Sequence, residues 1–209
     1  LFLKQKKIFA ANNLNSILEV GCSDGYLLYN LKKYGFKVRG CDPDMEAAAI
    51  GKKFGIKIDQ AFFNSEIYNK EKFDIIISRH FLEHLKDPEK IIIDKYSILK
   101  ENGYLIVEVP NTEYYLKNGL VESFSLQHLH GFSKNSLSQI LKRNKFSIIK
   151  TTKTPENLIL FCKKNKLADS NIISKNLNFK FTNHFLETKK KIKKNISIYL
   201  KNGKKVCFW

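Results

Sequence analysis

Short apolar runs alternate with longer amphipathic stretches along most of the chain. Runs rich in β-branched and aromatic residues predict strands at 16–20, 37–41, 56–59, 73–78 and 104–109. The stretches between them carry apolar residues at helical spacing and predict helices at 26–35, 44–55, 88–100 and 134–143. This alternation is typical of an α/β protein with a mostly parallel sheet.

The pattern changes after residue 145. Two apolar runs in FSIIKTTKTPENLILFCKK, residues 146–164, are joined by Thr-Pro-Glu-Asn, which is a typical turn sequence. The segment therefore predicts an antiparallel hairpin that completes the sheet. Together with the five earlier strands, the predicted fold class is a Rossmann-like, doubly wound α/β sheet of seven strands with a C-terminal antiparallel hairpin.

A single main domain is predicted for residues 1–165, because 43% of the 209 residues are hydrophobic and a chain of this size can bury a core of its own. Residues 166–209 are more polar and basic. Within them FLETKKKIKKNISIYL has a partial helical stripe, and KVCFW after Gly203 is typical of a strand. We expect residues 166–209 to form a basic helical linker and the first strand of a truncated further domain.

The net charge of +17 is concentrated at the C-terminal end. Residues 141–209 contain 18 Lys and Arg against 3 Asp and Glu, whereas residues 1–140 contain 19 against 17. Such a basic segment attracts nucleic acid or anionic surfaces. However, it contains a single arginine, Arg143, and arginine is the residue that normally makes bidentate contacts to bases. Nucleic acid is therefore disfavoured as a partner, and the sequence does not indicate an oligomeric state.

Simple patterns argue against several other classes of protein. The longest apolar runs, such as Ile75-Ile76-Ile77, are far shorter than the roughly 20 residues of a membrane-spanning helix. The opening LFLKQKKIFA lacks the features of a secretory signal, so we expect a cytoplasmic protein. The four cysteines, at 22, 41, 162 and 207, form no C-x-x-C pair, and neither a disulfide framework nor a metal site is predicted.

The stretch ILEVGCSDGYLLYNL, residues 17–31, runs from a predicted strand into a predicted helix. Gly21 and Gly25 provide the backbone freedom that a tight turn requires, and the helix presents free N–H groups to a ligand. Ligands of open α/β sheets bind outside the carboxyl ends of the strands, where the strand order reverses. Asp42 follows the second predicted strand, where an acid can bind ribose hydroxyls. The sequence therefore predicts a site for a nucleoside cofactor.

Two kinds of nucleoside cofactor fit this site. A dinucleotide such as NAD requires G-x-G-x-x-G around its pyrophosphate, but this turn reads Gly-Cys-Ser-Asp-Gly. Glu19 and Asp24 would repel a pyrophosphate and would attract a cofactor that carries an ammonium group and a sulfonium. An NAD-dependent oxidoreductase is therefore the less favoured alternative.

Four motifs, in this order, resemble those of class I S-adenosylmethionine-dependent methyltransferases: EVGCSDG, CDPD, FDIIISRHFLEHLKDP and LKENGYLIVEVPN. The resemblance covers about residues 10–163 and includes the closing hairpin. Ser23 departs from it, because many members have a glycine at that position. The resemblance implies S-adenosyl-L-methionine as the cofactor.

The resemblance also implies roles for the residues that match its motifs in the first half of the chain. The methionine part of the cofactor would be lined by Glu19, Gly21, Cys22 and Gly25. The ribose hydroxyls would be held by Asp42. Two alternative roles remain open: Asp24 could only cap a helix, and Glu19 could only bind backbone amides.

Further residues would complete the site. The adenine would lie between Pro43 and the segment Ala61-Phe62. The sulfonium and the acceptor would lie near Arg79 and His80, and His80 is a catalytic candidate.

The segment QHLHGFS, residues 127–133, forms a loop that should lie over the cofactor. Together with EVPN it resembles a branch that includes sugar C-methyltransferases, in which His128 would take the place of a histidine proposed as base. Gln127 stands where that branch has a glutamate. Histidine can accept a proton near neutral pH, so His128 is a catalytic candidate, and a hydrogen-bonded loop histidine is the alternative. His84 in FLEHLKDP is assigned a structural role.

These patterns predict an S-adenosylmethionine-dependent methyltransferase that acts on a small-molecule acceptor, specifically a nucleotide-linked or polysaccharide sugar. Alternatives within the class are O- or N-methylation of another metabolite or of RNA. A catalytically silent binding module would show the same fold and is the alternative from another class.

Overall fold

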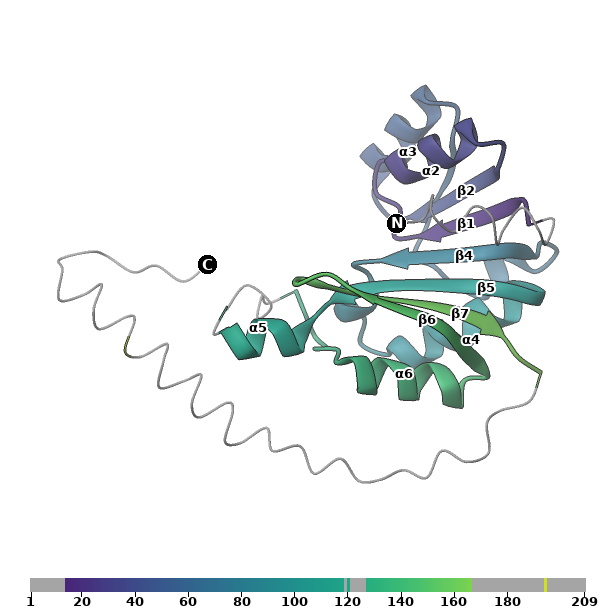
Figure 1. The fold of residues 1–209 in the computed structure, drawn as a ribbon. Helices are drawn as coiled ribbons and strands as arrows, with labels where there is room; N and C mark the ends of the chain where they lie inside the picture. Colours follow the sequence, from purple (N-terminus) through teal and green to yellow (C-terminus); the bar gives the residue numbers. More distant parts are fainter. Residues whose placement is uncertain (1–13, 119, 121–126, 167–193, 195–209) are drawn as a thin grey trace, which may run out of the picture.

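A seven-stranded mixed sheet forms the centre of the protein (Figure 1). The structure, a computed structural model, describes residues 14–118, 120, 127–166 and 194. The strands are β1 (Ser16–Val20), β2 (Lys37–Asp42), β3 (Lys57–Gln60), β4 (Phe73–Arg79), β5 (Leu99–Pro110), β6 (Phe146–Lys153) and β7 (Asn157–Lys164).

The strand order is β3-β2-β1-β4-β5-β7-β6. The first five strands are parallel, while β7 pairs antiparallel with both β5 and β6. The direction of winding reverses between β1 and β4, so the crevice at their carboxyl ends is where this fold binds ligands. The predicted seven-stranded Rossmann-like sheet and its C-terminal hairpin are confirmed.

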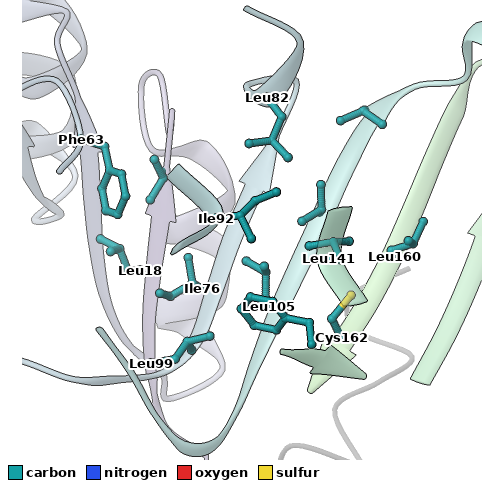
Figure 2. Close-up of a cluster of buried hydrophobic side chains, with 14 of the residues drawn as sticks. Leu18, Phe63, Ile76, Leu82, Ile92, Leu99, Leu105, Leu141, Leu160 and Cys162 are labelled. Atoms are coloured by element: carbon teal, nitrogen blue, oxygen red, sulfur yellow. The ribbon is translucent and has the colours of Figure 1, made fainter. Parts of the chain in front are cut away.

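Helices cover both faces of the sheet, because alternate residues of each strand point to opposite sides. Ile76 of β4 packs in the cluster that contains Ile92 of α4 (Pro88–Ile98) and Leu141 of α6 (Lys134–Arg143). Figure 2 shows these side chains converging from both helices and from the central strands. Ile75 and Ile77 of the same strand face the other side and pack with Leu28 and Leu31 of α2 (Tyr26–Lys33).

The remaining elements that the structure describes are two α-helices and two 3-10 helices. Helix α3 (Met45–Lys53) follows β2 and begins with Asp44 as its N-cap, whose side chain accepts a hydrogen bond from the Glu46 N–H. Two 3-10 helices, η2 (Ser65–Tyr68) and η3 (Leu82–His84), and helix α5 (Thr112–Asn118) were not predicted from the sequence.

The largest difference from the predicted boundaries is at the start of β5. The helix expected over 88–100 ends at Ile98, and β5 begins at Leu99 instead of near residue 104. Leu99 pairs with Phe73, and the register then shifts before Ile75 pairs with Tyr104. The buried contact with Phe73 therefore outweighs the helical pattern at Leu99.

The C-terminal predictions fall almost entirely outside the described residues. Of residues 167–209 the structure describes Lys194 alone, so the predicted linker helix and final strand stay predictions. Among the helices in the described part of the chain, none has the length and apolar character needed to cross a membrane.

Candidate active site

The turn after β1 has the backbone that its glycines predict. Gly21 has φ 72° and Gly25 has φ 75°, in the left-handed region that glycine adopts without steric cost. Ser23 also has a positive φ, 47°, which explains why a glycine would fit this position. The Ser23 N–H donates a hydrogen bond of 2.8 Å to the Asp42 carboxylate, and this bond holds the turn in place.

Gly21 is tightly enclosed. Its N–H donates to the Cys41 carbonyl oxygen at 2.9 Å, which joins the turn to β2. A Cβ atom added at Gly21 would lie 2.6 Å from Cδ2 of Phe81. A side chain at this position would therefore displace Phe81, and the bare backbone of Gly21 is a packing requirement as well as a conformational one.

Asp42 ends β2 beside this turn. One of its carboxylate oxygens accepts from Ser23, and the other accepts from the Asp44 N–H at 3.0 Å. The carboxylate is thereby held in a fixed orientation at the carboxyl edge of the sheet. This is the position from which an acid can bind ribose hydroxyls.

Glu19 is a buried acid on the neighbouring strand, with none of its side chain exposed. Its Oε1 accepts from Nε of Arg79 at 2.9 Å, and Nη2 of Arg79 lies at the same distance. Burial raises the pKa of the Glu19 carboxyl to about 7, and the pairing with Arg79 opposes only part of that shift. Its Oε2 is buried and has no hydrogen-bond partner among residues 14–118 and 127–166.

Asp24 contacts the backbone at the start of α2, where Gly25 is the N-cap. Its Oδ1 accepts a hydrogen bond of 3.0 Å from the Tyr26 N–H at the first turn of α2. Glu19, in contrast, binds Arg79 and not a backbone amide.

The residues predicted to flank the adenine lie along the same edge. Pro43 follows Asp42 and is exposed, and Phe62, which follows β3, has 83% of its surface exposed. The N–H of Ala61 donates to the Asp42 carbonyl oxygen at 3.2 Å, which places this segment next to the end of β2. An apolar ring as exposed as Phe62 is available to stack on a flat ligand.

Cys22 is buried, so only its backbone can face a ligand. Burial raises the pKa of the Cys22 thiol well above its usual range. The thiol is therefore protonated at neutral pH and cannot act as a nucleophile.

His80, directly after β4, lies between two carboxylates. Its Nδ1 is 3.6 Å from Oε1 of Glu83, and its Nε2 is 3.8 Å from Oε1 of Glu108. Glu83 above all, and then Glu108, raise the pKa of His80, while burial opposes them. His80 also has a left-handed backbone with φ 46°, a conformation that is uncommon outside glycine and is often found at functional sites.

His128 lies in a second group, with Glu83 and His84. The rings of His84 and His128 are 5.0 Å apart. Both predicted catalytic histidines, His80 and His128, therefore approach Glu83. Sequence reasoning missed Glu83, because a glutamate in FLEH gives no sign that it is buried.

The turn and the ends of β1 and β2 fit S-adenosylmethionine. The buried Oε2 of Glu19 accepts no hydrogen bond from the described residues, and an ammonium group supplies donors. Asp42 offers the carboxylate that a ribose diol requires. A pyrophosphate would meet acids instead of the glycine pair that it needs.

Comparison with known proteins agrees with this geometry. A family model described as a methyltransferase domain matches residues 2–151. Two curated relatives are ubiquinone biosynthesis O-methyltransferases. The protein from Haemophilus ducreyi is 30% identical over 114 residues, which is 48% of this chain and 48% of the relative. The protein from Actinobacillus pleuropneumoniae is 32% identical over 123 residues, 53% and 51% of the two chains. The chain thus spans about half the length of the curated relatives it matches.

Solved structures share the fold. An S-adenosylmethionine-dependent methyltransferase from Clostridium acetobutylicum has a TM-score of 0.61 and 15% identity, and the match covers 76% of this chain and 88% of that one. A 1,6-didemethyltoxoflavin-N1-methyltransferase from Burkholderia thailandensis, solved with S-adenosylhomocysteine, has a TM-score of 0.60 and 16% identity, over 77% and 76% of the chains. At these identities the likeness concerns the fold.

Proposed function

This chain belongs to the class I, S-adenosylmethionine-dependent methyltransferases through its methyltransferase domain, and from this premise we propose that it transfers a methyl group to a hydroxyl oxygen of a small polar acceptor. The observation that carries the methyl-transfer part of the proposal is the constellation at the carboxyl ends of β1 and β2. There the turn from Gly21 to Gly25, the fixed carboxylate of Asp42 and the buried acid Glu19 lie together.

We assign the cofactor-binding roles as the motifs imply. Glu19, with the backbone of Gly21, Cys22 and Gly25, would bind the methionine part, and Asp42 would bind the ribose. The adenine would lie between Pro43 and the segment that contains Ala61 and Phe62. Arg79 would hold Glu19 in its orientation through the 2.9 Å pair.

The bound cofactor supplies a methyl group that its sulfonium has already activated. The protein's remaining task is to align the acceptor oxygen with that methyl group, and such positioning can supply roughly 7–11 kcal/mol in favourable cases. The loop from Gln127 to His130 and the turn at His80 are the parts of this chain that we assign to the acceptor. The role of His128 as a base, and that of His80 as a catalytic group, stay predictions.

The acceptor atom is inferred from the relatives. The two curated relatives are named as O-methyltransferases, which favours oxygen over carbon. A nucleotide-linked or polysaccharide sugar, the acceptor suggested by QHLHGFS, also offers hydroxyl oxygens and stays a candidate. The finer resemblance to sugar C-methyltransferases stays a prediction.

The test is a transfer assay with an isotopically labelled methyl donor and two acceptor panels, ring hydroxyl compounds and nucleotide-linked sugars. We expect label on an oxygen of one panel, located by mass-spectrometric fragmentation. Label on carbon would contradict the proposed acceptor atom. Binding of S-adenosylhomocysteine without transfer to any acceptor would support a silent binding module instead.

A further inference from the structure

Three potential metal ligands meet beside the acceptor loop. Glu83 and His84 belong to η3, and His128 lies in the loop before α6. One ligand atom from each of these residues lies within 4.8 Å of the other two. Bonds from Zn²⁺ to nitrogen or oxygen are roughly 2.0–2.1 Å long, so the three side chains would have to close by about 1 Å to share one ion.

Glu83 is a buried carboxylate beside the loop that carries His128. Only 1% of its surface is exposed, and neither carboxylate oxygen has a hydrogen-bond partner among the described residues. A buried carboxylate is costly unless it is paired or binds a metal. Nδ1 of His80 lies 3.6 Å from Oε1 of Glu83, which is close enough for an ion pair but too far for a hydrogen bond.

The ring of His84 is held by the backbone of the acceptor loop. Its Nδ1 lies 2.9 Å from the Gln127 carbonyl oxygen. A carbonyl oxygen only accepts, so Nδ1 carries the proton, and the lone pair of the neutral ring is on Nε2. Metal-binding histidines almost always donate their second ring N–H to a carbonyl or carboxylate in this way.

The backbone fixes the two segments against each other. The N–H groups of Leu129 and His130 both donate to the Glu83 carbonyl oxygen, at 2.7 and 3.1 Å. The loop that carries His128 is thereby held against η3. The three side chains are brought together by backbone hydrogen bonds that do not depend on a metal.

We propose that Glu83, His84 and His128 bind one first-row divalent cation such as Zn²⁺, and that this ion holds the acceptor hydroxyl. Two imidazoles and one carboxylate suit Zn²⁺, whereas Mg²⁺ and Ca²⁺ prefer oxygen ligands. Three protein ligands leave a position open for an acceptor oxygen. The second part of the proposal rests on the proposed function, and in it His128 binds the ion instead of acting as the base.

The ion would make the hydroxyl more acidic. The hydroxyl proton passes to solvent, and the oxygen then forms the new O–C bond as the C–S bond breaks. The electron pair of the broken bond stays on sulfur, which leaves a neutral thioether. Charge and atoms balance without a further reactant.

The binding test uses the whole chain after removal of metals with a chelator. Calorimetric titration with Zn²⁺, without methyl donor or acceptor, should give one site per chain. His84→Ala and His128→Ala should each weaken it at least tenfold, while His130→Asn, a neighbouring loop histidine outside the cluster, should change affinity less than twofold. Unchanged affinity in both alanine variants, or no binding by the wild-type chain, would overturn the site.

Two further readouts separate folding and function from metal binding. Affinity for S-adenosylhomocysteine should be the same in the wild-type chain and in the His84→Ala, His128→Ala and His130→Asn variants. Equal affinities would show that the variants fold. The visible absorption of bound Co²⁺ should change in Glu83→Gln. If the wild-type chain binds Zn²⁺ but shows no transfer to any acceptor, the proposed function fails and the site stands. If transfer proceeds equally fast with the chelator present, the role of the ion in holding the acceptor is wrong.

Discussion

Gly21 and Gly35 both have positive φ, but their surroundings differ. The φ of Gly35 is 87° and a Cβ there would meet nothing within 4 Å, whereas at Gly21 it would meet Phe81. Gly35→Ala should therefore cost only the left-handed backbone penalty, about 1–2 kcal/mol of unfolding free energy. Gly21→Ala adds the overlap and should cost about 1–3 kcal/mol more. Urea unfolding of both variants measures the difference, and equal losses would contradict the packing argument.

Asp42 and Asp44 are a matched pair two residues apart. Both accept backbone N–H groups, but only Asp42 lies where the ribose is expected. Asp42→Ala should weaken binding of S-adenosylhomocysteine by about 10- to 100-fold, because hydrogen bonds to a charged group contribute about 1.5–3 kcal/mol. Asp44→Ala should change that affinity less than threefold. If calorimetry finds the same affinity for the Asp42 variant as for the wild-type chain, Asp42 does not bind the ribose.

At the scale of residues, the sequence predicts which residues occupy turns and strand ends, because these positions have a recognisable local pattern. Gly21, Gly25 and Asp42 could be predicted because a strand-to-helix turn and a strand end leave a pattern in the sequence. The group formed by Glu83, His84 and His128 could not. It depends on the burial of one carboxylate and on a contact between residues about 45 positions apart in the chain.

At the scale of the elements, the main feature is a fully buried lysine, Lys95, on helix α4. None of the surface of Lys95 is exposed, its Nζ donates to Oγ of Ser78 at 2.7 Å, and it lies 4.9 Å from the ring centre of Phe81. Burial lowers the pKa of Lys95 from 10.5 to about 7. Between these values the unfolded chain binds a proton that the folded chain does not, so the stability of the folded chain rises with pH across this window.

Lys95→Met should remove this dependence. We expect the variant to be more stable than the wild-type chain at pH 6 by about 1–3 kcal/mol, because an apolar residue carries no buried charge. The advantage should shrink as the pH rises from 7 towards 10. Lys90→Met, an exposed position on the same helix, is the control and should leave the pH profile unchanged. Urea unfolding between pH 6 and 10 that gives parallel profiles for Lys95→Met and the wild-type chain would contradict the buried charge.

Elements with a clear apolar pattern were predicted from the sequence, whereas η2, η3 and α5 were not. Strand β4 contains the apolar run Ile75-Ile76-Ile77, and α6 has a capping serine, Ser133, that is visible in the sequence and present in the structure. The 3-10 helices η2 and η3 contain three or four residues, too few to show a period.

At the scale of the whole molecule, the alternation of strands and helices along the sequence predicts the topology of the sheet. The topology in turn determines where the candidate cofactor site lies. The order β3-β2-β1-β4-β5-β7-β6 brings the ends of β1, β2 and β4 together, although they are separated in the sequence by two helices and a third strand. The acceptor is not encoded at this level, because the same fold serves many reactions. The basic segment beyond residue 166 lies outside the described residues, Lys194 excepted, and its role stays a prediction.

The central claim is that the turn from Gly21 to Gly25 binds S-adenosylmethionine. Calorimetric titration of the purified chain with S-adenosylhomocysteine, and in parallel with NAD, tests it most directly. We predict a single site with a dissociation constant on the order of micromolar for S-adenosylhomocysteine and no binding of NAD. Binding of NAD alone would contradict the assignment of this turn, and binding of neither ligand would show that the turn does not form a cofactor site in this chain.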